Sequence, residues 1–187
     1  MLTIITAPNP ILSQTAKEVS KLDKNILKFI EEMKQSLESA KDPIGVGLAA
    51  PQVGKSVRIF IAKPSDKSKV LIFINPKILT KSSEKDYVKR PKKDASEKAS
   101  KKLEGCLSLP NIWGPVLRSS SLILFYLDQN GNTHKEKFSG FLSTIIQHEL
   151  DHLNGILFPK WVLEQKGPLY KSSKDEKNED VFEEIEI

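Results

Sequence analysis

The segment His-Glu-Leu-Asp-His at residues 148–152 constrains the fold of this chain more than any other feature. On an α-helix, residues four positions apart lie on the same face, so His148 and His152 can bind one metal ion. Glu149 then lies beside the ion, where a metal-dependent hydrolase has its general base. The alternative is a pair of polar residues on the exposed side of a helix, but the chain has only three histidines. The motif therefore predicts a metal-binding helix to which other segments bring further groups.

Apolar residues at three- and four-residue steps predict two helices. The first covers residues 23–40, with Asp23 as its N-cap. The second covers residues 139–154 and contains the two motif histidines, and Gly155 after it suits a left-handed C-terminal cap. The apolar residues of the second helix are Leu142, Ile145, Ile146, Leu150 and Leu153. Because they occupy a wide part of its surface, we expect this helix to lie at the centre of the molecule.

Strands are predicted between the two helices. Candidate runs of strand length occur at residues 57–62, 70–74, 121–128 and 133–138. The last two runs are joined by Gln-Asn-Gly-Asn at 129–132, and Asn-Gly is a strong hairpin signal. Strands grouped between helices indicate an α+β fold. We expect mixed or antiparallel β-sheets to pack around a central HExxH helix, with a further helix near the N-terminus.

Size and composition indicate one soluble domain. The chain has 187 residues, of which 39% are hydrophobic and 28% are charged, and this length can bury a core. Its longest apolar run, residues 122–127, is strand-sized, and its first residues lack the pattern of a secretory signal. The single cysteine cannot form an internal disulfide. We therefore expect a cytoplasmic protein without a membrane partner.

Charge divides the chain into segments. We expect residues 1–165 to form the catalytic domain and residues 166–187 to form an acidic tail. The alternation at 184–187 predicts a short edge strand in that tail. Residues 82–102 are rich in lysine and almost free of core-forming side chains, so they predict a surface insertion.

A third metal ligand is needed, because catalytic sites of this type usually have three protein ligands and one open position. The longer pattern HExxHxxGxxH requires a histidine where this chain has Phe158, which excludes that class of metalloprotease. Glu164 and the acids of the tail are candidates, as in proteases with two histidines and a glutamate. Cys106 lies in a loop constrained by glycine and proline, and its thiolate suits a divalent transition metal. A buried inert thiol or a nucleophile paired with a histidine are the other interpretations of Cys106.

Three segments together resemble the peptide deformylase family. They are Gly-Val-Gly-Leu-Ala-Ala-Pro-Gln at 45–52, Glu-Gly-Cys-Leu-Ser at 104–108 and the HExxH motif at 148–152. The order is that of the family, and the match covers roughly residues 5–165. The resemblance implies an α+β metallohydrolase that removes the N-formyl group from new bacterial or bacterial-derived proteins, acting on N-formyl-methionyl peptides. It also implies one divalent metal ion, usually Fe²⁺ in cells, with Zn²⁺, Ni²⁺ or Co²⁺ able to occupy the site.

The resemblance also implies roles for individual residues. The metal ligands would be Cys106, His148 and His152. Glu149 would be the general acid and base, while Gln52 and the backbone N–H of Leu107 would stabilise the oxyanion. Such donors matter because a formamide is a poor electrophile and negative charge develops on its oxygen.

Five further residues are candidates for binding the substrate. Val46, Phe141 and Ile145 are expected to form an apolar pocket for the methionine side chain, with core packing as the alternative. Gly47 would let the backbone approach an extended peptide. Glu104 would bind the substrate or anchor its own loop.

The chain departs from well-known bacterial members of the family in three places. Trp113 stands where those members often have an arginine, residues 82–102 are longer than the family norm, and the tail is acidic rather than a basic helix. We expect the basic insertion to contact ribosomal RNA in place of that helix, and we expect no DNA partner. The alternatives to a deformylase are an HExxH metalloprotease that cleaves internal peptide bonds and a non-catalytic metal- or RNA-binding protein.

Overall fold

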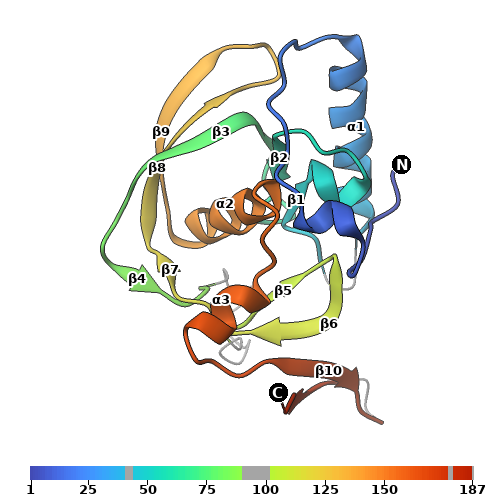
Figure 1. The fold of residues 1–187 in the computed structure, drawn as a ribbon, viewed down its shortest axis with the longest axis vertical. Helices are drawn as coiled ribbons and strands as arrows, with labels where there is room; N and C mark the ends of the chain where they lie inside the picture. Colours follow the sequence, from blue (N-terminus) through green and yellow to red (C-terminus); the bar gives the residue numbers. More distant parts are fainter. Residues whose placement is uncertain (41–43, 90–101, 177–178, 187) are drawn as a thin grey trace.

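Antiparallel sheets and one central helix make up the fold in the computed structural model, which describes residues 1–40, 44–89, 102–176 and 179–186 (Figure 1). The elements in chain order are η1 (Pro10–Ser13), α1 (Lys24–Ser39), β1 (Gly47–Ala49), η2 (Ala50–Val53), β2 (Ile59–Ala62), β3 (Leu71–Lys81), β4 (Lys85–Asp86), β5 (Glu104–Cys106), β6 (Leu109–Gly114), β7 (Arg118–Ser119), β8 (Ser121–Leu127), β9 (Thr133–Ser139), α2 (Gly140–Leu153), α3 (Pro159–Glu164), β10 (Tyr170–Lys174) and β11 (Asp180–Glu184).

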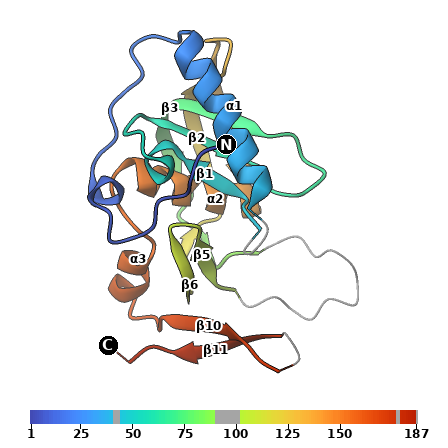
Figure 2. The ribbon, with the colours of Figure 1, turned by 90° about the vertical axis from the view of Figure 1, so that its right-hand side faces the viewer.

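The larger sheet has five antiparallel strands in the order β1-β2-β3-β8-β9 and separates the two long helices. Figure 2 shows α1 in front of this sheet and α2 behind it. Side chains alternate between the two faces of a strand, so Ile59 and Ile61 of β2 join the core around α1, while Phe60 joins the core around α2. The sheet thus forms one wall for the helix that contains the HExxH motif.

The smaller sheet has the order β11-β10-β6-β5, so β5 lies at its edge. The acidic tail forms a hairpin of β10 and β11, and β10 extends the sheet by pairing with β6 (Figure 2). The edge strand, β11, is Asp180–Glu184 and so ends where the alternation predicted as a strand at 184–187 begins. A short pair, β4 with β7, stands apart from both larger sheets.

Both predicted helices are present. The side chain of Asp23 accepts a hydrogen bond from the N–H of Ile26 at 2.9 Å, which caps α1. Helix α2 ends before Gly155, which has a φ of 69° and whose missing Cβ would lie 2.6 Å from the backbone of Ser13. Gly155 is therefore needed both for the left-handed turn and for the close approach of the N-terminal segment.

The strand predictions hold in position but not always in length. The run predicted at 70–74 continues as β3 to Lys81, with irregular register between Ile74 and Lys77 and again between Ile78 and Thr80. Of the insertion predicted at 82–102, residues 85–86 form β4, and residues 90–101 lie outside the described residues. In the part of the chain that is described, no helix is long and apolar enough to span a membrane.

Candidate active site

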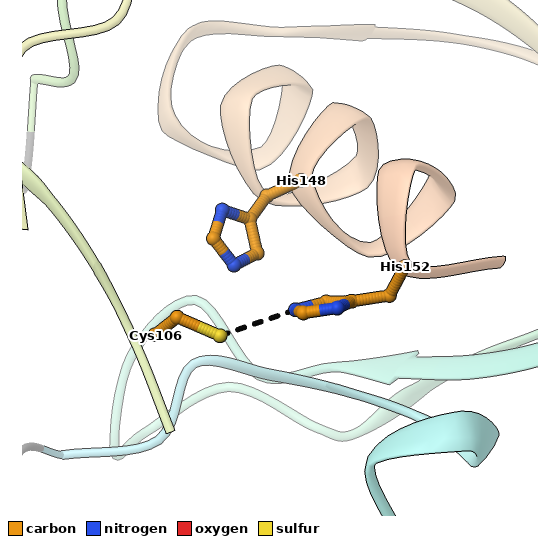
Figure 3. A group of neighbouring side chains, drawn as sticks. All are labelled: Cys106, His148 and His152. Carbon is orange, nitrogen blue, oxygen red and sulfur yellow. Dashed lines mark hydrogen bonds between the residues drawn. The ribbon is translucent and has the colours of Figure 1, made fainter. Parts of the chain in front are cut away.

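Two histidines of α2 and the last residue of β5 converge on one point. The ligand atoms of Cys106, His148 and His152 all lie within 4.8 Å of one another, and the sulfur of Cys106 is 3.2 Å from Nε2 of His152. Figure 3 shows both imidazoles projecting from consecutive turns of α2 toward the thiol. The helical spacing therefore places both rings on the face that meets the edge of the smaller sheet.

The sulfur of Cys106 is buried and receives two further polar groups. The N–H of Ser108 lies 3.4 Å from the sulfur, and Nε2 of Gln52 lies 3.6 Å from it. Leu107 follows Cys106 in the tight turn between β5 and β6, and its side chain packs against the core around α1. The turn thus fixes the position of the thiol relative to η2, which contains Gln52.

The amide of Gln52 is oriented by its own neighbours. Its Oε1 accepts the N–H of Ala49 at 2.8 Å, so Nε2 faces Ser108 Oγ at 3.2 Å and the sulfur of Cys106. The side chain is 1% exposed. Gln52 consequently presents hydrogen-bond donors, and no charge, to the site.

His148 is held from behind by a buried carboxylate. Its Nδ1 lies 3.0 Å from Oε2 of Glu104, and Glu104 in turn receives Nε and Nη2 of Arg118 at 2.6 and 2.9 Å. Burial opposes ionisation of Glu104, but the charge of Arg118 and hydrogen bonds from His148 and Arg118 prevail and lower its pKa to about 2. The carboxylate therefore stays ionised and fixes the orientation of the imidazole.

Arg118 extends this network to α3. Its Nη1 donates to Oδ2 of Asp151 at 2.8 Å, and the same oxygen accepts Nε1 of Trp161 at 2.7 Å. Although burial disfavours the charge, Glu104 and Asp151 raise the pKa of Arg118 further. One buried guanidinium thus joins β5, β7 and α2.

The two histidines differ in their preferred protonation. Burial opposes charging of His148, but its hydrogen bonds with Cys106 and Glu104 raise its pKa well above the usual range. Burial and the charge of His148 lower the pKa of His152 well below the usual range. A neutral His152 keeps a lone pair with which to bind a cation.

Glu149 is a buried residue of α2 whose side chain lies against Gly47 of β1. It is 3% exposed, and its Oε2 has no hydrogen-bond partner among the described residues. A Cβ built on Gly47 would lie 2.8 Å from Cδ of Glu149, so glycine here lets the carboxylate occupy its present position. Burial raises the pKa of Glu149 to about 7, which lets this group take up and release a proton near neutral pH.

The donor set fits a divalent transition metal. A thiolate with two imidazoles suits ions such as Zn²⁺ or Fe²⁺, and ligands about 2.0–2.3 Å from one ion must lie within a few ångströms of each other. The three ligand atoms satisfy this condition. Three protein ligands leave at least one position open for water or substrate.

The alternative ligands from the sequence lie elsewhere. Glu164 is exposed and lies 3.9 Å from Lys160, and it is not part of the only candidate metal cluster in the described residues. Phe158 stacks on His148, with ring centroids 6.1 Å apart. Phe158 is thus a packing partner of the site.

The substrate candidates fall into two groups. Val46 and Phe141 are partly buried and pack at the margin of the core around α2. Ile145 is 3% exposed within that core, and both oxygens of Glu104 are occupied by Arg118 and His148. The geometry therefore gives Ile145 a core position and Glu104 a position behind His148.

Arg118 and Trp161 were missed by reasoning from sequence. No motif marks either residue, and each contacts the site through another side chain. The sequence carried no signal for them, because the burial of Glu104 and the approach of Asp151 to Arg118 appear only in the structure.

Comparison with known proteins finds a family and relatives that match most of the chain. A family model described as polypeptide deformylase matches residues 1–167. A peptide deformylase of Chlorobium luteolum is 39% identical over 163 residues, which cover 84% of this chain and 76% of that protein. One from Borreliella burgdorferi is 33% identical over 157 residues, which cover 84% of this chain and 85% of the relative.

Solved structures give the same result. The peptide deformylase of Ehrlichia chaffeensis in complex with actinonin matches with a TM-score of 0.76 and 34% identity, over 89% of this chain and 91% of that one. The peptide deformylase of Thermotoga maritima matches with a TM-score of 0.72 and 35% identity, over 86% of this chain and 97% of that one. The α+β fold expected from the sequence is the fold of these proteins.

Proposed function

This chain belongs to the polypeptide deformylase family, and from that premise we propose that Cys106, His148 and His152 bind the metal of the family's reaction. The reaction is the metal-dependent removal of the N-terminal formyl group from formylated polypeptides, with release of formate. The observation that supports this ligand set is the convergence of one thiol and two imidazoles within 4.8 Å. When bound, the ion supplies a water of lowered pKa and polarises the formyl carbonyl.

Glu149 is the general acid and base in this proposal. Its buried carboxylate lies on the helix of the two histidines, and its pKa of about 7 suits both directions of transfer. It accepts a proton from the attacking water and delivers that proton to the departing amine. The close contact with Gly47 keeps the carboxylate at the site.

Gln52 and the N–H of Leu107 are the donors for the developing oxyanion. The Ala49 N–H that holds Oε1 leaves Nε2 of Gln52 directed at the site, and such preorganised donors cost no reorganisation during the reaction. A neutral amide stabilises the oxyanion without competing with the three ligands for the metal.

The proposed substrate site has three residues. Val46 and Phe141 are the proposed walls of the methionine pocket, and Gly47 admits the backbone of the peptide. Ile145 supports that pocket from the core. Glu104 orients His148 rather than binding the peptide, since both of its oxygens are already hydrogen-bonded.

A comparison of two substrates tests this function. Protein purified anaerobically should release formate from formyl-Met-Ala-Ser and leave an internally quenched protein substrate intact. The reverse result would identify an internal protease instead.

Elemental analysis of variants tests the roles of the site residues. Cys106→Ser should lose its metal, because a hydroxyl is a poor ligand at neutral pH. Glu149→Ala should retain the metal and lose formate release, and a metal-free Glu149→Ala would assign Glu149 a structural role. The same metal analysis decides between Fe²⁺, our expectation, and Zn²⁺, Ni²⁺ or Co²⁺.

The ribosome is the proposed partner of the basic insertion at 82–102. The eight lysines and arginines of the insertion, against four acids, favour contact with RNA phosphates, and residues 90–101 lie outside the described residues. We infer a cytoplasmic location, where formylated chains are made, and a catalytic domain at 1–165 followed by the tail. Deleting 82–102 should lower salt-sensitive co-sedimentation with ribosomes while small-peptide turnover persists. Unchanged co-sedimentation would exclude this role.

A further inference from the structure

One part of the five-stranded sheet has a face that no helix covers. Helix α1 packs over β1, β2 and the nearer half of β3, and the core around α1 extends as far as Leu127 of β8. Ile123 and Phe125, which point to the same face as Leu127, belong to none of the core clusters of the described residues. Phe125 is 39% exposed. An aromatic ring on an inner strand therefore faces solvent.

Lysines flank these apolar residues in register. Phe125 pairs with Lys77 of β3 on one side and with Lys135 of β9 on the other. Two residues before Phe125 on β8, Ile123 pairs with Lys137 of β9. Paired residues project to the same side of a sheet, so the five residues form one surface, called here the lysine–phenylalanine face.

The charge of this face is uncompensated. Strands β3 and β8 contain no acidic residue, and the single acid of β9, Glu136, pairs with Leu124 and so points to the opposite face. Lys77, Lys135 and Lys137 make no ion pair within the described residues. Protection of an edge strand explains lysines on β9, but it explains neither Lys77 on an inner strand nor the exposed ring beside it.

We propose that the lysine–phenylalanine face binds single-stranded RNA. Adjacent strands lie about 4.8 Å apart, which puts the backbones that bear Lys77 and Lys135 roughly 10 Å apart on either side of Phe125. A base can stack on the ring while neighbouring phosphates contact the lysines, which is how β-sheets bind single strands. Rings beside lysines also occur on surfaces that bind lipids, so vesicle binding is one of the outcomes of the test below.

This site does not rest on deformylation. The face lies on the side of the sheet opposite to Phe73, Leu124 and Tyr126, which pack against α2 and its histidines. RNA on the outer face would therefore leave the metal ligands accessible. An enzyme that binds RNA here can process a peptide at the same time.

Binding of a fluorescein-labelled U12 RNA to the full-length protein, followed by anisotropy across a salt series, tests the proposal. Lys135→Gln with Lys137→Gln should flatten the slope of log K against log[salt] by about 1.4, since each single-strand phosphate contact contributes about 0.7. The matched control is Lys24→Gln with Lys28→Gln on exposed turns of α1, which removes the same charge. The control should keep the slope of the wild-type protein.

The ring is tested separately. Phe125→Ala should weaken binding by about 5- to 150-fold, the equivalent of one stacked base at about 1–3 kcal/mol, whereas Phe125→Tyr should bind like the wild-type protein. Equal losses in the two lysine pairs, or wild-type affinity in Phe125→Ala, would overturn the proposal. Tighter binding to phosphatidylglycerol vesicles than to RNA would overturn it in favour of a membrane. Formate release should be unchanged in every variant, and its absence from the wild-type protein would refute the proposed enzyme without affecting the RNA result.

Discussion

Replacing Arg118 by methionine tests whether the buried network stabilises the fold. The guanidinium is 6% exposed and donates three hydrogen bonds of 2.6 to 2.9 Å, two to Glu104 and one to Asp151. Methionine keeps the apolar stem of the side chain and removes its charge, so the buried carboxylate of Glu104 and the partly buried carboxylate of Asp151 are left without their cation. Breaking a buried ion pair from one side costs about 3–5 kcal/mol. For a chain of this length, that corresponds to a fall in Tm of about 6 to 20 °C.

The lowered pKa of Glu104 predicts how the destabilisation of Arg118→Met changes with pH. The pKa of Glu104 is about 2 in the folded protein and about 4.3 in an unfolded chain, so its ionisation stabilises the fold above the unfolded value. That contribution disappears as pH falls toward 2. The difference in stability between the wild-type protein and Arg118→Met should therefore be widest above about pH 5 and should narrow below pH 4.

Urea unfolding of chelator-treated wild-type and variant proteins measures the difference in the free energy of unfolding at pH 7 and at pH 3. Removing the metal keeps it from contributing to that difference. Arg118→Lys keeps one charge but loses the paired N–H groups, so its stability should lie between the two. A difference below about 1 kcal/mol at pH 7, or one that is equal at both pH values, would refute the reasoning.

Three further changes have defined outcomes. Gly47→Ala places a methyl group on the carboxylate of Glu149, so kcat should fall by about 10² or more while elemental analysis finds the same metal content; full activity would show that the carboxylate can move. Gln52→Glu keeps the acceptor for the Ala49 N–H but removes the donor, which should lower kcat by about 10²–10³. Asp128→Asn should lower the pKa of His134, which the hydrogen bond to Asp128 raises against a small effect of burial; NMR titration measures this shift. While Asp128 is ionised, the stabilisation that depends on the charge of His134 is present below the unfolded histidine pKa of about 6.5 and is lost as pH rises through the raised value. The stability difference between the wild-type protein and the variant should therefore narrow in alkali to what the bonds from Asn130 and Asn132 to Asp128 contribute.

Local patterns predicted the parts of the fold that depend on local forces. Asp23 marks the start of α1 and Gly155 the end of α2, because capping and left-handed turns need particular residues at particular positions. The Asn-Gly turn at 129–132 set the register of β8 with β9. Strand β3 was predicted too short, since its outer half gains partners only from β8, almost fifty residues later.

The residues of the site were likewise predicted where short motifs contain them and missed where their contacts are distant in sequence. Cys106 and the two histidines came from short motifs, and the structure brings their ligand atoms together. Glu104 was expected to bind the substrate or to anchor its own loop, and the structure shows its carboxylate hydrogen-bonded to Arg118. A lone arginine far from any motif gives no sign of its partners, so the network behind His148 became visible only in three dimensions.

The order of the three motifs along the chain has a consequence for synthesis. Gln52 precedes Cys106 by 54 residues, and Cys106 precedes His152 by 46. At about 5–20 residues per second, the thiol exists for roughly 2 to 9 seconds before the last histidine has been made. A growing chain thus contains its only cysteine before it contains the two histidines that complete the metal site, and metal loading must wait until α2 has been made.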